Sequence, residues 1–279
     1  MLTVLSRWNK HVAALASSAA LALSGSGHTA DLPSPGAELA SRILRLSDSQ
    51  RVHALAELPR AEKLVFYQHM TQADLLALGR KALAGFGVYR ARASKDERVD
   101  GRTRGPDVID TIVREEPRAV LLDFVGGPHK GRRVLYNAEL RPRQMLARES
   151  GMLGFISVWL SIDSWLARRD THHRITEVGF GAMLDIMAKD LARVRTAGGY
   201  QRQDEGFDAH GRYCIFLSAP PASHGLSAER LRFCVDAGLG VPLRIEVYDA
   251  LGLREYLDYG DLQLHLDPDS LFEPAHAGL

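Results

Sequence analysis

The sequence predicts an α+β protein built from a curled antiparallel sheet, a half-barrel, with helices covering its concave face and a helical segment before it. Before about residue 85 the apolar side chains repeat at helical spacing, whereas from Val88 they alternate with polar ones, as in strands. One helical pattern, 177–195, interrupts the strands. Because so long an antiparallel sheet must curl, we expect helices 71–84 and 177–195 to cover its concave face.

The first thirty residues have the order of a secretory signal. Arg7 belongs to a basic start, residues 12–23 (VAALASSAALAL) form a short apolar run, and residues 24–30 (SGSGHTA) offer small residues for a peptidase. We therefore expect export to the periplasm with cleavage after Ala30, or alternatively after Gly27. The alternative structure, an Ala-rich amphipathic helix, would need a polar stripe that the run lacks. No segment reaches the roughly 18 apolar residues of a membrane span, so we expect no transmembrane helix.

Residues 31–70 are predicted to be a linker followed by three helices. Prolines open this stretch, and apolar residues then repeat at helical spacing over 37–46, 48–58 and 60–70. The half-barrel is expected to occupy residues 71–279. Its first helix, 71–84, begins with T-Q-A-D, close to a capping box but with an Asp in place of Glu or Gln.

The central feature is a strand pair, 117–137 (PRAVLLDFVGGPHKGRRVLYN), with a glycine-rich turn. Its alternation predicts two half-buried antiparallel strands. We expect one face of the pair to point into the concave interior and to contact a ligand. That face carries Val120, Leu122, Phe124, Val134 and Tyr136.

Further strands surround this pair. Residues 88–99 and 108–116 are polar and suit the exposed face of a sheet, and 144–148 and 156–162 are short. After helix 177–195, strands are predicted at 200–207, 213–218, 231–236, 243–248, 254–259 and 262–266. The apolar face near the end of the chain carries Leu243, Ile245 and Val247, and helix 177–195 carries Met183 and Met187. This methionine-containing stripe is either plain core or the adaptable lining of a pocket.

The composition excludes some functions. Hydrophobic residues make up 46% of the 279 residues, enough for a sizeable core, and the formal net charge is +1. So small a net charge provides no long-range field to attract nucleic acid or an acidic membrane.

The two cysteines fall in consecutive predicted strands. Residue 224 lies midway between Cys214 and Cys234, so a turn centred there would place the two opposite each other. An oxidising periplasm would then permit a disulfide. A shift of one residue in register would separate them, and two free thiols are an equal alternative.

No catalytic, metal or cofactor motif is recognised. His172 and His173 lack the spacing of a metal site and are expected in a solvent-exposed loop. Nucleophile motifs lack usable partners, and the glycines at 85 and 87 stop a helix instead of opening one. Glu149 is the acidic group considered as a general acid, but we expect it to accept hydrogen bonds from backbone N–H groups of its loop. We expect no enzyme activity, no cofactor and no metal.

Three stretches resemble the bacterial DUF1571 family, which has no established activity. They are YRARASKDERVDG (89–101), the central pair 117–137 and the loop ARESGMLG (147–154). The ending, 241–272, resembles the last strands of the wider LolA/LppX-like superfamily of periplasmic lipoprotein and lipid carriers. This resemblance implies an unclosed barrel that curls round helices and encloses an apolar cavity.

Together these observations predict a periplasmic, non-enzymatic protein that binds a lipid or another hydrophobic ligand, in envelope lipid or lipoprotein trafficking. The alternative is an envelope scaffold that binds a protein partner and fills its cavity with its own side chains. A weaker alternative is a hydrolase with an unrecognised site.

Overall fold

A computed structural model describes residues 34–279, apart from 152–153, 155, 222 and 268–269. The expected signal peptide and its cleavage site therefore lie outside the described residues. The chain after residue 32 forms one unit.

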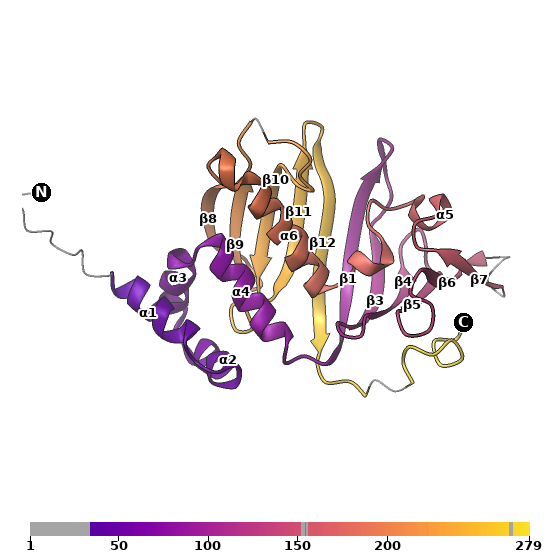
Figure 1. Cartoon of the computed structure of the whole chain (residues 1–279), viewed down its shortest axis with the longest axis horizontal. Coiled ribbons are helices and arrows are strands. Elements are labelled where there is room, and N and C mark those ends of the chain that lie inside the picture. The colour runs from indigo at the N-terminus through magenta and orange to yellow at the C-terminus, as the bar shows by residue number, and fades with distance from the viewer. Residues whose placement is uncertain (1–33, 152–153, 155, 222, 268–269) are drawn as a thin grey trace, which may run out of the picture. The chain divides into compact units, whose positions relative to one another are not determined.

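The strands form one open antiparallel sheet of twelve strands (Figure 1). Its order is β7-β6-β5-β4-β3-β1-β12-β11-β10-β9-β8, and the short β2 pairs with β1. The strands are β1 (Val88–Val99), β2 (Arg102–Thr103), β3 (Asp107–Arg114), β4 (Ala119–Gly126), β5 (Arg133–Asn137), β6 (Gln144–Arg148), β7 (Ser157–Ser161), β8 (Gln201–Phe207), β9 (Tyr213–Ser218), β10 (Arg230–Val235), β11 (Pro242–Asp249) and β12 (Gly252–Gln263). With the helices below, this arrangement confirms the predicted α+β class.

Two helices lie across one face of the sheet, α4 and α6 (Figure 1). The helices are α1 (Pro35–Leu44), α2 (Asp48–Glu57), α3 (Arg60–His69), α4 (Gln72–Leu83), α5 (Trp165–Arg168) and α6 (Phe180–Val194), with 3₁₀ turns η2 (Ile175–Glu177) and η3 (Arg195–Ala197). The capping box of α4 forms with Asp at its third position. The Thr71 N–H donates to the Asp74 carboxylate (3.0 Å), and the Asp74 N–H donates to the Thr71 hydroxyl (3.1 Å).

The side chains facing the helices form two hydrophobic clusters. The first cluster lies between β8–β11 and the helices α1, α2, α3, α4 and the later part of α6. It includes Phe66, Tyr67, Leu217 and Phe233. The other joins the beginning of α6 to β1, β3–β6, β11 and β12. The helices before residue 70 thus share a core with the end of the sheet that carries β8–β11.

The prediction that strands 88–99 and 108–116 lie on an exposed face is wrong. β1 and β3 are in the middle of the sheet, where helices cover one face, and Tyr89 and Ala91 are fully buried. The polar character of these strands comes from paired charges on the opposite face. Asp110 accepts hydrogen bonds from Arg90 and from Arg92, whose Nε lies 2.8 Å away.

The end of the sheet also differs from the prediction. Residues 254–259 and 262–266 were expected to be two strands, but β12 continues to Gln263 through a bulge. Asp261 has a positive φ of 50°, and the register with β1 shifts between Arg90 and Arg92. The extra residue is accommodated without ending the strand.

The outer face of the central pair is less exposed than the alternation suggested. Leu135 is only 1% exposed, because Phe272 and Ala277 cover it in a third hydrophobic cluster. The C-terminus lies beside β5 (Figure 1), and the Arg133 guanidinium donates to the Ala277 carbonyl (3.1 Å).

Candidate ligand-binding site

A cavity of about 190 Å³ lies between the helix side of the sheet and two covering elements, α6 and residues 166–178. We call residues 163–178 the cover segment. Its helical structure is limited to the short helix α5 and the 3₁₀ turn η2. The apolar lining comprises Ala93, Ile109, Leu122, Phe124, Val134, Met145, Leu166, Ala167, Ile175, Val178, Met183, Ile186, Met187, Ala228, Leu231, Ile245, Val247, Leu257 and Tyr259. An apolar space of this kind favours an apolar guest.

The structure brings together seven of the ten predicted ligand-binding residues. The residues that line the cavity are Leu122, Phe124, Val134, Met183, Met187, Ile245 and Val247. The other three, Val120, Tyr136 and Leu243, belong to the hydrophobic cluster beneath it without lining the cavity. Val120 is fully buried and Tyr136 is 5% exposed, so their side chains pack against other side chains of the core.

The lining changes from apolar to charged along the strands. On β1, Ala93, Lys95 and Glu97 share one face, and all three line the cavity. The neighbouring strands change in the same direction. In the sheet register, Lys95 stands opposite Asp107 of β3, and Glu97 stands opposite Glu255 of β12. The cavity therefore has an apolar end and a charged end.

Charged groups at this end attach the cover segment to the sheet. Asp170 of the cover segment pairs with Arg132 at 3.2 Å, and His173 pairs with Glu255 at 2.9 Å. Three further contacts do the same: Lys95 Nζ to Thr171 Oγ1 (2.9 Å), the His172 N–H to Glu97 Oε1 (2.6 Å) and His129 Nε2 to Asp170 Oδ2 (3.7 Å). The cover is thus held by polar contacts at the end of the cavity where the lining is charged.

The pair of His173 and Glu255 is ionised over a wide pH range. Burial disfavours the imidazolium of His173, but the charge of Glu255 and hydrogen bonds with Glu177 and Glu255 outweigh it and raise its pKa to about 10. For Glu255, burial acts against ionisation, and the positive His173 outweighs it and lowers the pKa to about 2. The hydrogen bond from His173 is the main cause that lowers the pKa of Glu177 to about 2. At neutral pH the attachment is therefore a charged one.

Sequence reasoning missed this charged end. The expectation of a solvent-exposed loop is wrong for His173, whose side chain is 27% exposed and lies between two carboxylates. Glu149, the acidic group singled out from the sequence, is half exposed and pairs with Arg132 (3.1 Å). A usable signal was present in β12, where Glu255, Leu257 and Tyr259 are spaced two residues apart and so face the interior together.

The ligating atoms of Glu97, His173 and Glu255 lie within 4.8 Å of one another, the spacing of a metal site. Each of the two carboxylates already has a cationic partner. Lys95 Nζ lies 2.6 Å from Glu97, and His173 forms an ion pair with Glu255. A metal ion would have to displace both. The arrangement is therefore that of an ion-pair network, and no cofactor-binding loop accompanies it in the described residues.

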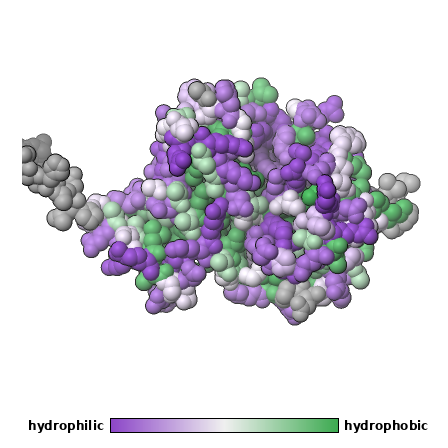
Figure 2. Space-filling view, in the orientation of Figure 1, coloured by the Kyte–Doolittle hydropathy of each residue, from purple (hydrophilic) through white to green (hydrophobic). Residues whose placement is uncertain are grey.

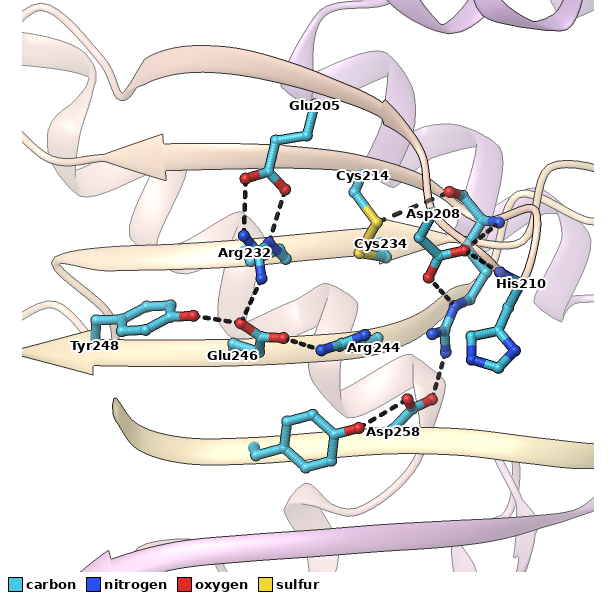
Figure 3. The surroundings of a disulfide bond; sticks show 12 residues. Glu205, Asp208, His210, Cys214, Arg232, Cys234, Arg244, Glu246, Tyr248 and Asp258 are labelled. Atoms are coloured by element: carbon cyan, nitrogen blue, oxygen red, sulfur yellow. Dashed lines mark hydrogen bonds and ion pairs between the residues drawn. A yellow bond between two sulfur atoms is a disulfide. The ribbon is translucent and has the colours of Figure 1, made fainter. Parts of the chain in front are cut away.

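The two cysteines lie on the other face of the sheet. Cys214 of β9 and Cys234 of β10 stand directly opposite each other and are joined by a disulfide (Figure 3). The residues next to them, Ile215 and Phe233, alternate to the helix side and belong to the core. The register that the sequence left open is thus the one that pairs the sulfurs.

Ion pairs surround the disulfide on this face (Figure 3). Arg232 bonds to both oxygens of Glu205 (2.7 and 3.0 Å) and to Glu246 (2.9 Å), while Arg212 pairs with Asp208 at 2.7 Å. These contacts cross β8 to β11, so this part of the sheet is fixed by a covalent bond as well as by charge.

Several solved structures are similar to this one at low sequence identity. An uncharacterised conserved protein from Thermus thermophilus is 9% identical, with a TM-score of 0.43 over 73% of this chain and 93% of that chain. The lipoprotein LppX of Mycobacterium tuberculosis is 13% identical, with a TM-score of 0.40 over 71% and 100%. A LolA superfamily protein from Nitrosomonas europaea is 14% identical, with a TM-score of 0.31 over 73% and 98%. Similarity at this level carries no inference about ligand or activity.

No curated protein matches the chain in sequence. Residues 87–276 match the family described as "Protein of unknown function (DUF1571)", and this range contains all the strands and every residue that lines the cavity. Because the match spans more than half of the sequence, the chain belongs to the DUF1571 family.

Proposed function

We propose that this protein is a non-enzymatic binding protein of the periplasm that holds one apolar chain of an amphiphilic ligand in the cavity under α6 and the cover segment. The observation that carries this proposal is the lining, which is apolar around Leu122, Val134 and Met187 and charged around Lys95 and Glu97. A ligand with an apolar chain and a polar head matches both ends.

The volume limits the ligand. Pockets that enclose whole drug-sized ligands measure about 300–1,000 Å³, whereas this cavity measures about 190 Å³. It therefore has room for part of one acyl chain while the head stays at the charged end. A diacyl lipid would fit only if the cover segment moved outward.

Two observations favour the periplasm. The first residues have the order of an export signal. The disulfide between Cys214 and Cys234 belongs to an oxidising compartment, since cytosolic thiols are kept reduced. A role in the trafficking of envelope lipids or lipoproteins follows from this location and from the ligand class.

The experiment is to purify the exported protein from the periplasm, to record its native mass spectrum and to identify lipids after organic extraction. We expect an adduct that matches an acyl lipid. Leu122→Gln places a polar group in the apolar lining and should abolish the adduct in protein that still unfolds cooperatively, while the exposed change His265→Ala should retain it. An unliganded wild type that also fails to take up added fatty acid would contradict the proposal and favour the scaffold alternative.

A further inference from the structure

An exposed apolar patch lies at the free edge of the sheet, where β7 leads into α5. We call it the β7–α5 patch, and it consists of Ile156, Val158, Trp165 and Leu166. Trp165 is 75% exposed and the other three are close to half exposed. Hydrophobic residues also gather at this end of the molecule in the surface view (Figure 2), on the right where Figure 1 places β7 and α5. Several large apolar side chains exposed together mark an interaction surface more often than one does alone.

The patch is continuous with the cavity. Along β7, Val158 alternates with Trp159 and shares a face with Leu160, which packs against the cluster that holds the cavity. Leu166 belongs to both surfaces, since it is 47% exposed and lines the cavity. A ligand leaving beneath the cover segment at α5 would therefore meet the patch.

The chain segment that contains the patch carries an excess of positive charge. Residues 141–174 contain six arginines and three acids, a formal charge of +3, although the whole chain carries only +1. Arg143 and Arg168 are exposed and have no carboxylate partner among the described residues. The acids are already paired: Asp163 with Arg174 at 2.6 Å, and Glu149 and Asp170 with Arg132. The charges of Arg143 and Arg168 are therefore not neutralised by an acid and can meet an anionic surface.

We propose that the β7–α5 patch docks onto an anionic lipid surface and that the ligand is exchanged there. Tryptophan is favoured at the level of lipid headgroups, where its ring contacts the acyl boundary. Arginines beside such a side chain each add about 1 kcal/mol of attraction to an anionic leaflet. The apolar side chains and the charge therefore point to the same partner.

A second copy of the chain fits this surface less well. In a two-fold contact each patch would face its own copy, and so Arg143 and Arg168 would approach the same arginines of the other molecule. Like charges placed opposite each other weaken such a contact. An anionic bilayer has the complementary charge and no fixed shape, so it can adapt to the patch.

The test is co-sedimentation of the purified protein with vesicles of phosphatidylcholine containing 30% phosphatidylglycerol, compared with vesicles of pure phosphatidylcholine. We expect binding to the anionic vesicles, weakened at 0.5 M salt by screening. The double change Arg143→Gln and Arg168→Gln should reduce partitioning about 30-fold, since two cations contribute about 1 kcal/mol each. Trp165→Ala should reduce it at least tenfold.

Leu251→Ala is the matched control, since Leu251 is 80% exposed in the turn between β11 and β12, away from this charge. Its partitioning should equal that of the wild type. Equal loss in Leu251→Ala, no preference for anionic vesicles, or a dimer that only Trp165→Ala disrupts would each overturn the docking proposal. Vesicle binding and fatty-acid binding are measured separately, so the loss of the first with the second retained rejects the docking surface and leaves the proposed function standing.

Discussion

Strands β8 to β11 and strands β1, β3 to β6 and β12 belong to one sheet, but their helix-facing surfaces are covered differently. Over β8–β11 lie α4, the later part of α6 and the helices before residue 70, and large side chains such as Tyr67 and Phe233 fill the space. Over the other strands lie the beginning of α6 and the cover segment, and a cavity remains that reaches Leu231 of β10 and Val247 of β11 at the boundary between the two regions. We call these the filled region and the cavity region.

The two regions are also held together differently. Ion pairs span neighbouring strands in both regions, and in the filled region a disulfide joins two strands as well. In the cavity region the cover segment is attached through contacts such as His173 with Glu255 and Arg132 with Asp170. Short polar contacts can break and re-form without unfolding the sheet. The comparison therefore assigns rigidity to one region and ligand access to the other.

The largest expected difference comes from the same substitution made in both regions. Leu217 is fully buried in the filled region, and Leu217→Ala should lower the free energy of unfolding by about 3–5 kcal/mol. Leu122 lines the cavity, so part of its side chain already lacks neighbours, and Leu122→Ala should cost about 1–2 kcal/mol. Urea unfolding measures both. Equal costs would show that the two regions are packed alike.

The disulfide should stabilise the filled region and leave the cavity unaffected. Replacing both Cys214 and Cys234 by Ala opens a link between residues 20 apart, and should cost about 3 kcal/mol in the chain-entropy model. Fatty-acid binding should persist in the variant that remains folded. Titration of thiols in unfolded, unreduced wild type should find none, and two free thiols would contradict the linkage.

Two alanines of β1, two residues apart, allow the packing of the two sites to be compared by substitution. Ala91 and Ala93 are both buried on the same face, but only Ala93 lines the cavity. Ala91→Leu should destabilise the protein by about 1–3 kcal/mol through overpacking. Ala93→Leu should cost about zero, because the added atoms enter open space. The two melting temperatures test this, and a reversed order would place the open space elsewhere.

The stability of the cavity region should also depend on pH, because the cover is attached by an ion pair. The pKa of His173 is raised to about 10, so its contribution to stability is complete below about pH 6.5 and is lost as the pH rises towards 10. The pKa of Glu255 is lowered to about 2, so its contribution is present above about pH 4.5 and is lost on acidification. The stability difference between wild type and His173→Gln should therefore fall by roughly 1 kcal/mol per pH unit between pH 7 and 9. A difference that stays constant would mean that the ion pair does not form.

Local sequence patterns predict some of these features, and the features they miss depend on the tertiary fold. Alternation placed Leu122 and Val134 on one face because the period of a strand requires it, and the capping box at Thr71 located α4. The alternation within β1 could not predict its burial, because the exposure of a strand depends on the strands beside it. One of these is β12, which is distant in sequence. The partners of His173 come from β12 and η2, so their meeting is a product of the tertiary fold that no local pattern contains.

The central claim is that the open space in the cavity region receives an apolar chain. The direct measurement is a fluorescence titration of delipidated protein with cis-parinaric acid, in the wild type and in Ala93→Phe, whose ring would occupy the space that Ala93 borders. The account predicts saturable binding of one molecule per chain to the wild type and at least tenfold weaker binding to Ala93→Phe, with cooperative unfolding retained. Equal binding by both proteins, or none by the delipidated wild type, would contradict it.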